Sequence, residues 1–174
     1  AVYNANNRIL SESRNITLEV RGAAPPKPRL HVLAVGVGKA AYIDNKLATP
    51  GVEFADRDAR AFVERIAGQA GDGRLYRSVS RRVLTSRAET SLAAIEQALR
   101  DIPFESGDTV VIFLAGHGKA VDNKYNFLPA DLVFENPQSI AGAALTQERI
   151  EGHLRRFGSG RVLLVLDTCN AGKM

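Results

Sequence analysis

The chain has 174 residues, of which 45% are hydrophobic and 24% are charged, and this balance excludes an intrinsically disordered protein. Its length is that of one domain and is enough to bury a sizeable core. The net charge of +4 is mildly basic and well short of that of a nucleic-acid coat protein. No apolar run reaches the roughly 18 residues of a transmembrane helix, and no signal peptide is visible. We therefore expect a cytoplasmic protein.

The first 28 residues predict one strand followed by a linker. The strand is predicted from apolar residues at alternate positions, namely Ile16, Leu18 and Val20. A single strand has no partner of its own, and the three prolines between residues 25 and 28 favour an extended linker. We interpret residues 1–28 as the tail of a preceding β-rich domain or an edge strand of the next sheet, and residues 29–174 as the main domain.

The main domain alternates between predicted strands and helices. Strands are predicted where apolar and β-branched residues gather, at residues 30–37, 82–85, 109–115, 125–128 and 161–166. Helices are predicted where apolar residues recur at helical spacing, at residues 53–67, 90–102 and 146–157. The strands at 30–37, 109–115 and 161–166 are nearly all apolar, which is typical of strands buried on both faces. The pattern predicts an α/β fold with a mainly parallel sheet and helices on both faces.

Chemically reactive residues follow two of these buried strands. The strand at 109–115 runs into Gly116-His117-Gly118, and the strand at 161–166 runs into Asp167-Thr168-Cys169. In open parallel sheets, ligands bind beyond the carboxyl ends of the strands, so His117 and Cys169 are expected at one edge. An imidazole beside a thiol raises the thiolate fraction or accepts the proton during attack. The backbone N–H groups of Gly118 and Cys169 are placed to hold a developing oxyanion.

Cys169 is the only cysteine of the chain, which excludes an internal disulfide and a zinc site of four cysteines. Taken alone, a single cysteine is most often a small buried hydrophobic residue, and a Gly-His-Gly sequence is most often a turn. Their positions at the ends of two separate buried strands favour the catalytic interpretation over both alternatives.

The segments 116–118 and 167–172 resemble the two catalytic motifs of the caspase-like cysteine peptidases, the clan of caspases, metacaspases and paracaspases. The likeness is greatest to the bacterial metacaspases, also called orthocaspases, and a CHAT-type relative is the nearest alternative. His117 precedes Cys169 by 52 positions, and in caspases the separation is about 50. The likeness runs from Leu30 to the end and includes Asp58-Ala59 and the segment 128–131 (Leu-Pro-Ala-Asp).

The resemblance implies a caspase-like three-layer sandwich and a cysteine endopeptidase. In it, Cys169 is the nucleophile, His117 is the general base and later the acid, and Gly118 supplies an oxyanion N–H. Where caspases carry a Gln two residues before the nucleophile, this chain has Asp167, as metacaspases and paracaspases do. An anionic pocket of this kind prefers Arg or Lys before the scissile bond.

A second acidic position of the family's substrate pocket matches Asp58, with Asp56 as a weaker competitor. The simpler interpretation of Asp58 is an acid at a helix terminus that interacts with the helix dipole. Many metacaspases bind calcium through several aspartates. Asp131 matches one such position, but residues 146–149 (Thr-Gln-Glu-Arg) stand where the family carries consecutive aspartates. We therefore expect no metal site, no calcium dependence and no other cofactor.

Two other functions remain as alternatives to the peptidase. The first is a catalytically silent caspase-like scaffold or regulatory module, against which the presence of both His117 and Cys169 weighs. The second is nucleic-acid binding by a cluster of five arginines, Arg74, Arg77, Arg81, Arg82 and Arg87. Only Tyr76 is interleaved with them as a stacking residue, so an ordinary solvated surface is the preferred interpretation of the cluster.

The resemblance also implies partners. Caspase-like domains continue past the nucleophile with strands and loops that wall the substrate pocket, whereas this sequence ends five residues after Cys169. We expect residues 29–174 to be the large-subunit part, completed by a small-subunit fragment and activated by proteolytic processing. The substrates are expected to be proteins or peptides, and the N-terminal strand and linker fit an adjacent sensor or repeat domain.

Overall fold

The structure is a computed structural model that describes residues 26–42, 52–69, 74–133, 136–169 and 171–174. The predicted strand at Ile16, Leu18 and Val20 and the first proline of the proposed linker, Pro25, therefore lie outside the described residues. The prediction of a domain boundary at residue 28 stays a prediction.

A four-stranded parallel sheet forms the centre of the molecule, in the order β2-β1-β3-β7. Its strands are β1 (Arg29–Gly36), β2 (Ser78–Leu84), β3 (Thr109–Gly116) and β7 (Arg161–Thr168). All three pairings are parallel, which confirms the predicted sheet. β2 begins four residues earlier than the predicted strand at 82–85. The apolar pattern did not reveal these residues, because the first half of β2 lies at an edge of the sheet and has few apolar side chains.

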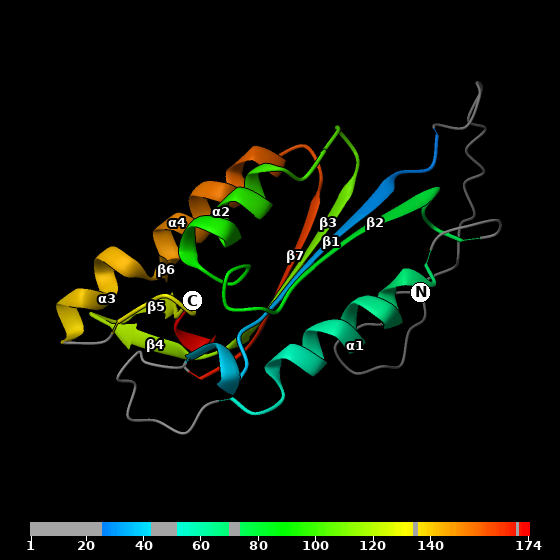
Figure 1. The fold of residues 1–174 in the computed structure, drawn as a ribbon. Coiled ribbons are helices and arrows are strands. Elements are labelled where there is room, and N and C mark those ends of the chain that lie inside the picture. The colour runs from blue at the N-terminus through cyan, green and yellow to red at the C-terminus, as the bar shows by residue number, and fades with distance from the viewer. Residues whose placement is uncertain (1–25, 43–51, 70–73, 134–135, 170) are drawn as a thin grey trace, which may run out of the picture.

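Helices cover both faces of this sheet (Figure 1). α1 (Ala55–Ala67) lies on one face, and α2 (Leu92–Arg100) and α4 (Gln147–Leu154) lie on the other. The predicted three-layer α/β architecture is thus confirmed. The helix predicted at 146–157 corresponds to α4 and to the 3₁₀ turn η2 (Arg155–Phe157) that follows it.

The pleat of the strands divides the core into two clusters. Val35 of β1 and Ile112 and Leu114 of β3 pack with α2 and α4. Their sequence neighbours Ala34 and Phe113 face the other way and pack with α1. Side chains of a strand point alternately to the two faces, so a strand between two helical layers must be apolar throughout.

The sequence of α1 explains how this helix packs on the sheet. Ala55, Ala59 and Val63 are spaced four residues apart and are all buried, so one stripe of the helix faces the strands. Gly36 at the end of β1 lets this stripe approach, because a Cβ there would lie 2.3 Å from the carbonyl oxygen of Ala55. The ring of Phe62 completes the contact by stacking on Phe113 of β3, with 4.4 Å between ring centroids.

A small second sheet lies beyond the carboxyl ends of the main strands. It contains β4 (Gly118–Val121), β5 (Lys124–Phe127) and β6 (Leu145–Thr146). β4 and β5 form a hairpin whose two turn residues, Asp122 and Asn123, have positive φ angles of 49° and 62°, as tight two-residue hairpin turns require.

The sequence pattern predicts only one strand of the second sheet, at residues 125–128, and no helix at α3 (Pro137–Ala143). Short elements of four residues carry too little periodicity to be recognised. Two further 3₁₀ turns, η1 (Lys39–Tyr42) and η3 (Ala171–Lys173), complete the described elements. None of the helices in the described ranges combines the length and the apolar character that crossing a membrane requires.

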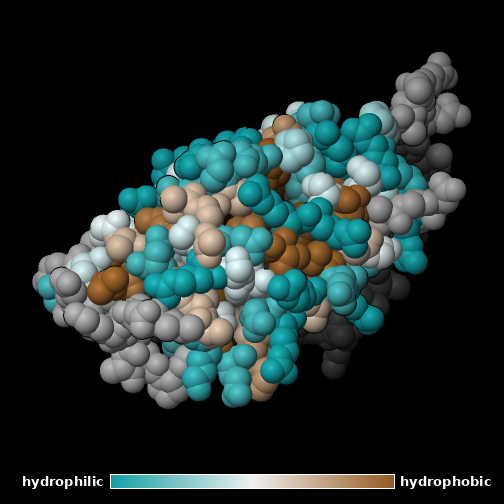
Figure 2. All heavy atoms as spheres, viewed as in Figure 1, coloured by the Kyte–Doolittle hydropathy of each residue, from teal (hydrophilic) through white to brown (hydrophobic). Residues whose placement is uncertain are grey.

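The prediction that the strand at 161–166 is buried on both faces is wrong. β7 is an edge of the described sheet, and Val162 and Leu163 are 38% and 52% exposed. Leu163 is in register with Val111, which packs under α1, but α1 packs mainly against β1, β2 and β3. β7 therefore carries a buried strand's sequence at an exposed edge. Figure 2 shows hydrophobic side chains interspersed among hydrophilic ones on the face of the molecule that it views.

Candidate active site

The two predicted motifs meet at the carboxyl edge of the sheet. β3 and β7 are parallel neighbours, and Gly116 is in register with Thr168. His117 and Cys169 therefore each follow directly after the last paired residue of their strand. A Cβ placed on Gly118 would lie 2.3 Å from the carbonyl oxygen of Cys169, so the two backbones touch at this point. The structure thus brings Gly118 and Cys169 together, as the sequence predicts.

The His117 side chain is half-buried, and one of its ring nitrogens is enclosed by protein. Its Nε2 atom is buried and has no hydrogen-bond partner among the described residues. Desolvation lowers the pKa of the His117 imidazole below its ordinary value, because burial disfavours the charged form. A neutral imidazole with an unengaged nitrogen can accept a proton, as a general base must.

Cys169 is an exposed free thiol, and the residue before it is anchored from the second sheet. The hydroxyl groups of Tyr125 on β5 and Thr168 lie 2.7 Å apart and share a hydrogen bond. Burial raises the pKa of Tyr125 to about 12, against the opposing effect of this hydrogen bond. Tyr125 therefore stays neutral and ties the end of β7 to β5, which fixes the start of the segment that carries Cys169.

The backbone of His117 is held by a second tyrosine. The hydroxyl oxygen of Tyr42 on η1 accepts a hydrogen bond from the N–H of His117 at 3.1 Å. Neither Tyr42 nor Tyr125 is predicted as a site residue from the sequence. Each is a single aromatic residue in a short element, and no local pattern shows that it reaches a motif 75 or 43 positions away.

The carboxylates of Asp167 and Asp58 are both exposed on the side of the sheet that α1 covers. Asp167 is exposed at the end of β7 and is in register with Ala115, which belongs to the cluster under α1. Its side chain is thus on the α1 side of the sheet. Asp58 is exposed on the first turn of α1, on the same side. The two carboxylates thus lie on the same side of the sheet, Asp167 on the edge strand β7 and Asp58 on α1.

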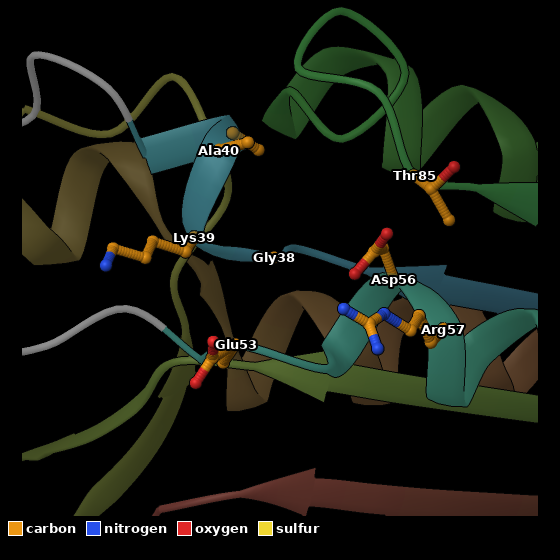
Figure 3. A pocket seen from close by; sticks show the side chains of 8 residues that line it. Gly38, Lys39, Ala40, Glu53, Asp56, Arg57 and Thr85 are labelled. Carbon is orange, nitrogen blue, oxygen red and sulfur yellow. The ribbon is translucent and has the colours of Figure 1, made fainter.

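A cavity of about 520 Å³ opens beside the carboxyl ends of β1 and β2. Its lining includes Glu53, Asp56 and Arg57 near the start of α1, and Thr85 after β2. Figure 3 shows the Asp56 carboxylate directed into the space between Gly38 and Thr85. Asp58 does not line this cavity. Of the two aspartates weighed in the sequence, Asp56 is thus the one that the cavity contains.

Asp131 and two of the clustered arginines form contacts within the fold. The Asp131 carboxylate accepts a hydrogen bond from the N–H of Leu92 at the start of α2. Among the described ranges, no group of three His, Cys, Asp or Glu side chains is arranged to hold a metal ion. Two of the clustered arginines form ion pairs, Arg77 with Glu105 at 3.8 Å and Arg82 with Asp101 at 3.2 Å.

His31, which the sequence placed on a strand, lies in a buried polar network at the opposite edge of the sheet. Its ring contacts Ser80 at 2.7 Å and Asp108 at 3.1 Å. Asp108 also accepts hydrogen bonds from Arg29. This network lies at the amino ends of β1 and β3 and ties them together, away from the two motifs.

No protein-family model matches the chain, and no curated protein matches it. The crystal structure of protein GSU0716 from Geobacter sulfurreducens is similar in fold, with a TM-score of 0.56 and 17% sequence identity. The similarity covers 82% of this chain and 51% of that protein's chain. The chain thus spans about half the length of that protein's chain. At this identity the likeness supports the α/β fold alone.

Proposed function

We propose that the protein is a cysteine endopeptidase in which Cys169 is the nucleophile and His117 is the general base. The observation that carries the proposal is the meeting of the two motifs, with Gly118 in contact with the backbone of Cys169. The His117 imidazole, whose pKa burial lowers, supports it further, although its Nε2 atom forms no hydrogen bond with Cys169 in the described residues. An exposed thiol is a suitable nucleophile because a peptide substrate can reach it.

In the proposed reaction, the Cys169 sulfur attacks the carbonyl carbon of the scissile bond while His117 takes the thiol proton. The N–H groups of Gly118 and Cys169 stabilise the negative oxygen. The C–N bond then breaks, and His117 returns the proton to the leaving amine. Water, deprotonated by His117, hydrolyses the thioester and regenerates the thiol.

The proposed specificity is for Arg or Lys before the scissile bond. Its support is the exposed carboxylate of Asp167, two residues from Cys169, and the carboxylates of Asp58 and Asp56 on the same side of the sheet. A guanidinium or ammonium group gains charge-assisted hydrogen bonds from such carboxylates. The proposed reaction needs no metal and no other cofactor, and the cytoplasm is the expected location because a lone reactive thiol is kept reduced there.

We also propose that a small-subunit segment completes the sheet beside β7 and that processing of the chain controls its activity. The support is the exposed edge described above, where Val162 and Leu163 present apolar surface. A strand with open backbone groups and apolar side chains is a template for pairing with another strand. We propose as well that a sensor or repeat domain adjoins this domain in the protein.

The test compares fluorogenic peptides that carry Arg, Lys or Asp before the leaving group. The full chain should cleave the first two, and Cys169→Ala and His117→Ala should reduce cleavage to background, whereas His153→Ala on α4 should not. Because Cys169 is the only cysteine, its alkylation by iodoacetamide can be followed without interference. Cleavage only after Asp would contradict the specificity. An alkylation rate that His117→Ala leaves unchanged, with no cleavage, would instead favour the silent scaffold.

A further inference from the structure

We propose that Tyr42 is the positioning residue of the catalytic histidine, an inference that rests on the function proposed above. Tyr42 lies on η1, directly after β1, whereas His117 follows β3. The contact therefore joins two neighbouring strands at the edge where the reaction is proposed to occur.

Three hydrogen bonds close a ring around the backbone of His117. The Tyr42 hydroxyl accepts from the His117 N–H at 3.1 Å and donates to the carbonyl of Leu128 at 2.7 Å. The N–H of Leu128 donates back to the carbonyl of His117 at 2.9 Å. Both backbone polar groups of His117 are thus engaged. Of the three hydrogen bonds, two depend on one side-chain oxygen.

The ring of Tyr42 also borders the imidazole. The two ring centroids are 4.8 Å apart, with an interplanar angle of 50°. The turn that brings them together needs a glycine, because Gly116 has a φ angle of 151° and a Cβ there would lie 3.2 Å from the Tyr42 hydroxyl. One tyrosine thus contacts the peptide group that precedes the imidazole and the imidazole itself.

Tyr42 is suited to a fixed role. Its side chain is buried, and desolvation raises the pKa of its hydroxyl well above the usual range, so the group stays a neutral donor and acceptor. Its own segment is held in place by hydrogen bonds from the Lys39 N–H to the Val52 carbonyl at 3.0 Å and from the Arg87 guanidinium to the Ala41 carbonyl at 3.0 Å.

The variant Tyr42→Phe tests this role because it keeps the ring and removes only the hydroxyl. It leaves the N–H of His117 and the carbonyl of Leu128 without that partner, so the imidazole gains freedom relative to Cys169. A misplacement of about 1 Å in an active site costs on the order of 100-fold in rate. We expect kcat to fall about 10- to 100-fold while KM changes less than about threefold, because substrate binding does not involve the hydroxyl.

The matched control is Tyr76→Phe, since Tyr76 is half-buried before β2 and contacts neither motif among the described residues. The alkylation rate of Cys169 as a function of pH is compared in the full-length wild type, both tyrosine variants and His117→Ala. We expect the part of the rate that depends on His117 to fall in Tyr42→Phe and to persist in Tyr76→Phe. Equal behaviour of the two tyrosine variants, or a loss confined to KM, would overturn the inference.

A second measurement separates this inference from the proposed function. The NMR signal of the His117 ring is titrated in the wild type and in Tyr42→Phe, with His31 and His153 as internal references. A hydroxyl that positions the imidazole predicts a His117 pKa closer to its ordinary value in the variant, because the loosened ring is better solvated. An unchanged titration would overturn the inference even if the peptidase is active. Inactivity of the wild type, with a changed titration, would refute only the proposed function.

Discussion

The contact between Gly118 and Cys169 is the most direct point at which the proposed site can be perturbed. A Cβ at position 118 would lie 2.3 Å from the carbonyl oxygen of Cys169, 2.8 Å from the Oγ1 atom of Thr168 and 2.9 Å from the Tyr125 ring. The nearest of these atoms belongs to the backbone and cannot rotate away. The variant Gly118→Ala must therefore push the two motifs apart.

The size of the effect follows from that distance. Ordinary van der Waals contact begins at 3.4 Å, so the backbones of positions 118 and 169 must separate by about 1 Å. Overpacking of this kind typically costs about 1–3 kcal/mol of the free energy of unfolding. The same displacement moves the oxyanion N–H groups and the thiol relative to His117, and about 100-fold of the cleavage rate should be lost.

The assay combines thermal or urea unfolding with the cleavage of an Arg-containing fluorogenic peptide. The control is Gly152→Ala on α4, where an added Cβ meets no atom within 4 Å. Alanine in a helix interior is more stable than glycine by roughly 0.5–1 kcal/mol, so this variant should gain stability and keep its activity. If Gly118→Ala were as stable and as active as Gly152→Ala, the proposed contact between the two motifs would be refuted.

Four further predictions concern stability, pH and metal. Asp108→Asn should lower the free energy of unfolding by about 1–3 kcal/mol, because buried hydrogen bonds to its carboxylate are lost. Burial alone would raise the pKa of Asp108, but hydrogen bonds from Arg29, Glu105 and His31 outweigh it and lower that pKa. The carboxylate therefore stabilises the fold above the unfolded pKa of about 3.9 and loses this effect as the pH falls further; a variant as sensitive to acid as the wild type in urea titrations would contradict this. Phe157→Ala should cost about 3–5 kcal/mol, since Phe157 is fully buried and packs edge-on against Phe104; a loss below about 1 kcal/mol in the same titration would be inconsistent with that packing. Because burial lowers the pKa of His117 from 6.5, the acid limb of kcat/KM should have its midpoint below pH 6.5, and a midpoint above it would show that the imidazole is more solvated. Finally, peptide cleavage should be unchanged by EGTA, because Asp131 bonds the start of α2; loss of activity that calcium restores would disprove calcium independence.

The sequence pattern predicted the main sheet and its helices because both kinds of periodicity are local. Strand β3 is continuously apolar, and Ala55, Ala59 and Val63 repeat at helical spacing. The position of the two motifs at one edge of the sheet was also predictable, because parallel neighbouring strands end at the same edge. The strand predicted at 161–166 failed in one respect, because its exposure depends on what lies beside it and not on its own residues.

The short elements around the site were beyond local reasoning. Tyr42 and Tyr125 contact His117 and Thr168 across 75 and 43 positions, and neither lies in a segment long enough to show a period. The sequence could not decide whether Asp56 or Asp58 lines the cavity, because the two residues lie on the same helical turn and differ only in the direction of their side chains.

The sequence by itself thus determined the α/β class, the buried strands β1 and β3 and the two motifs with Cys169 and His117, because residue type and local periodicity specify these directly. Only the tertiary structure decided that Gly118 touches Cys169, that Tyr42 and Tyr125 hold the two motifs, and that β7 is exposed. The physical reason is that such contacts join residues brought together by the packing of separate strands, and burial is a property of a residue's neighbours in space.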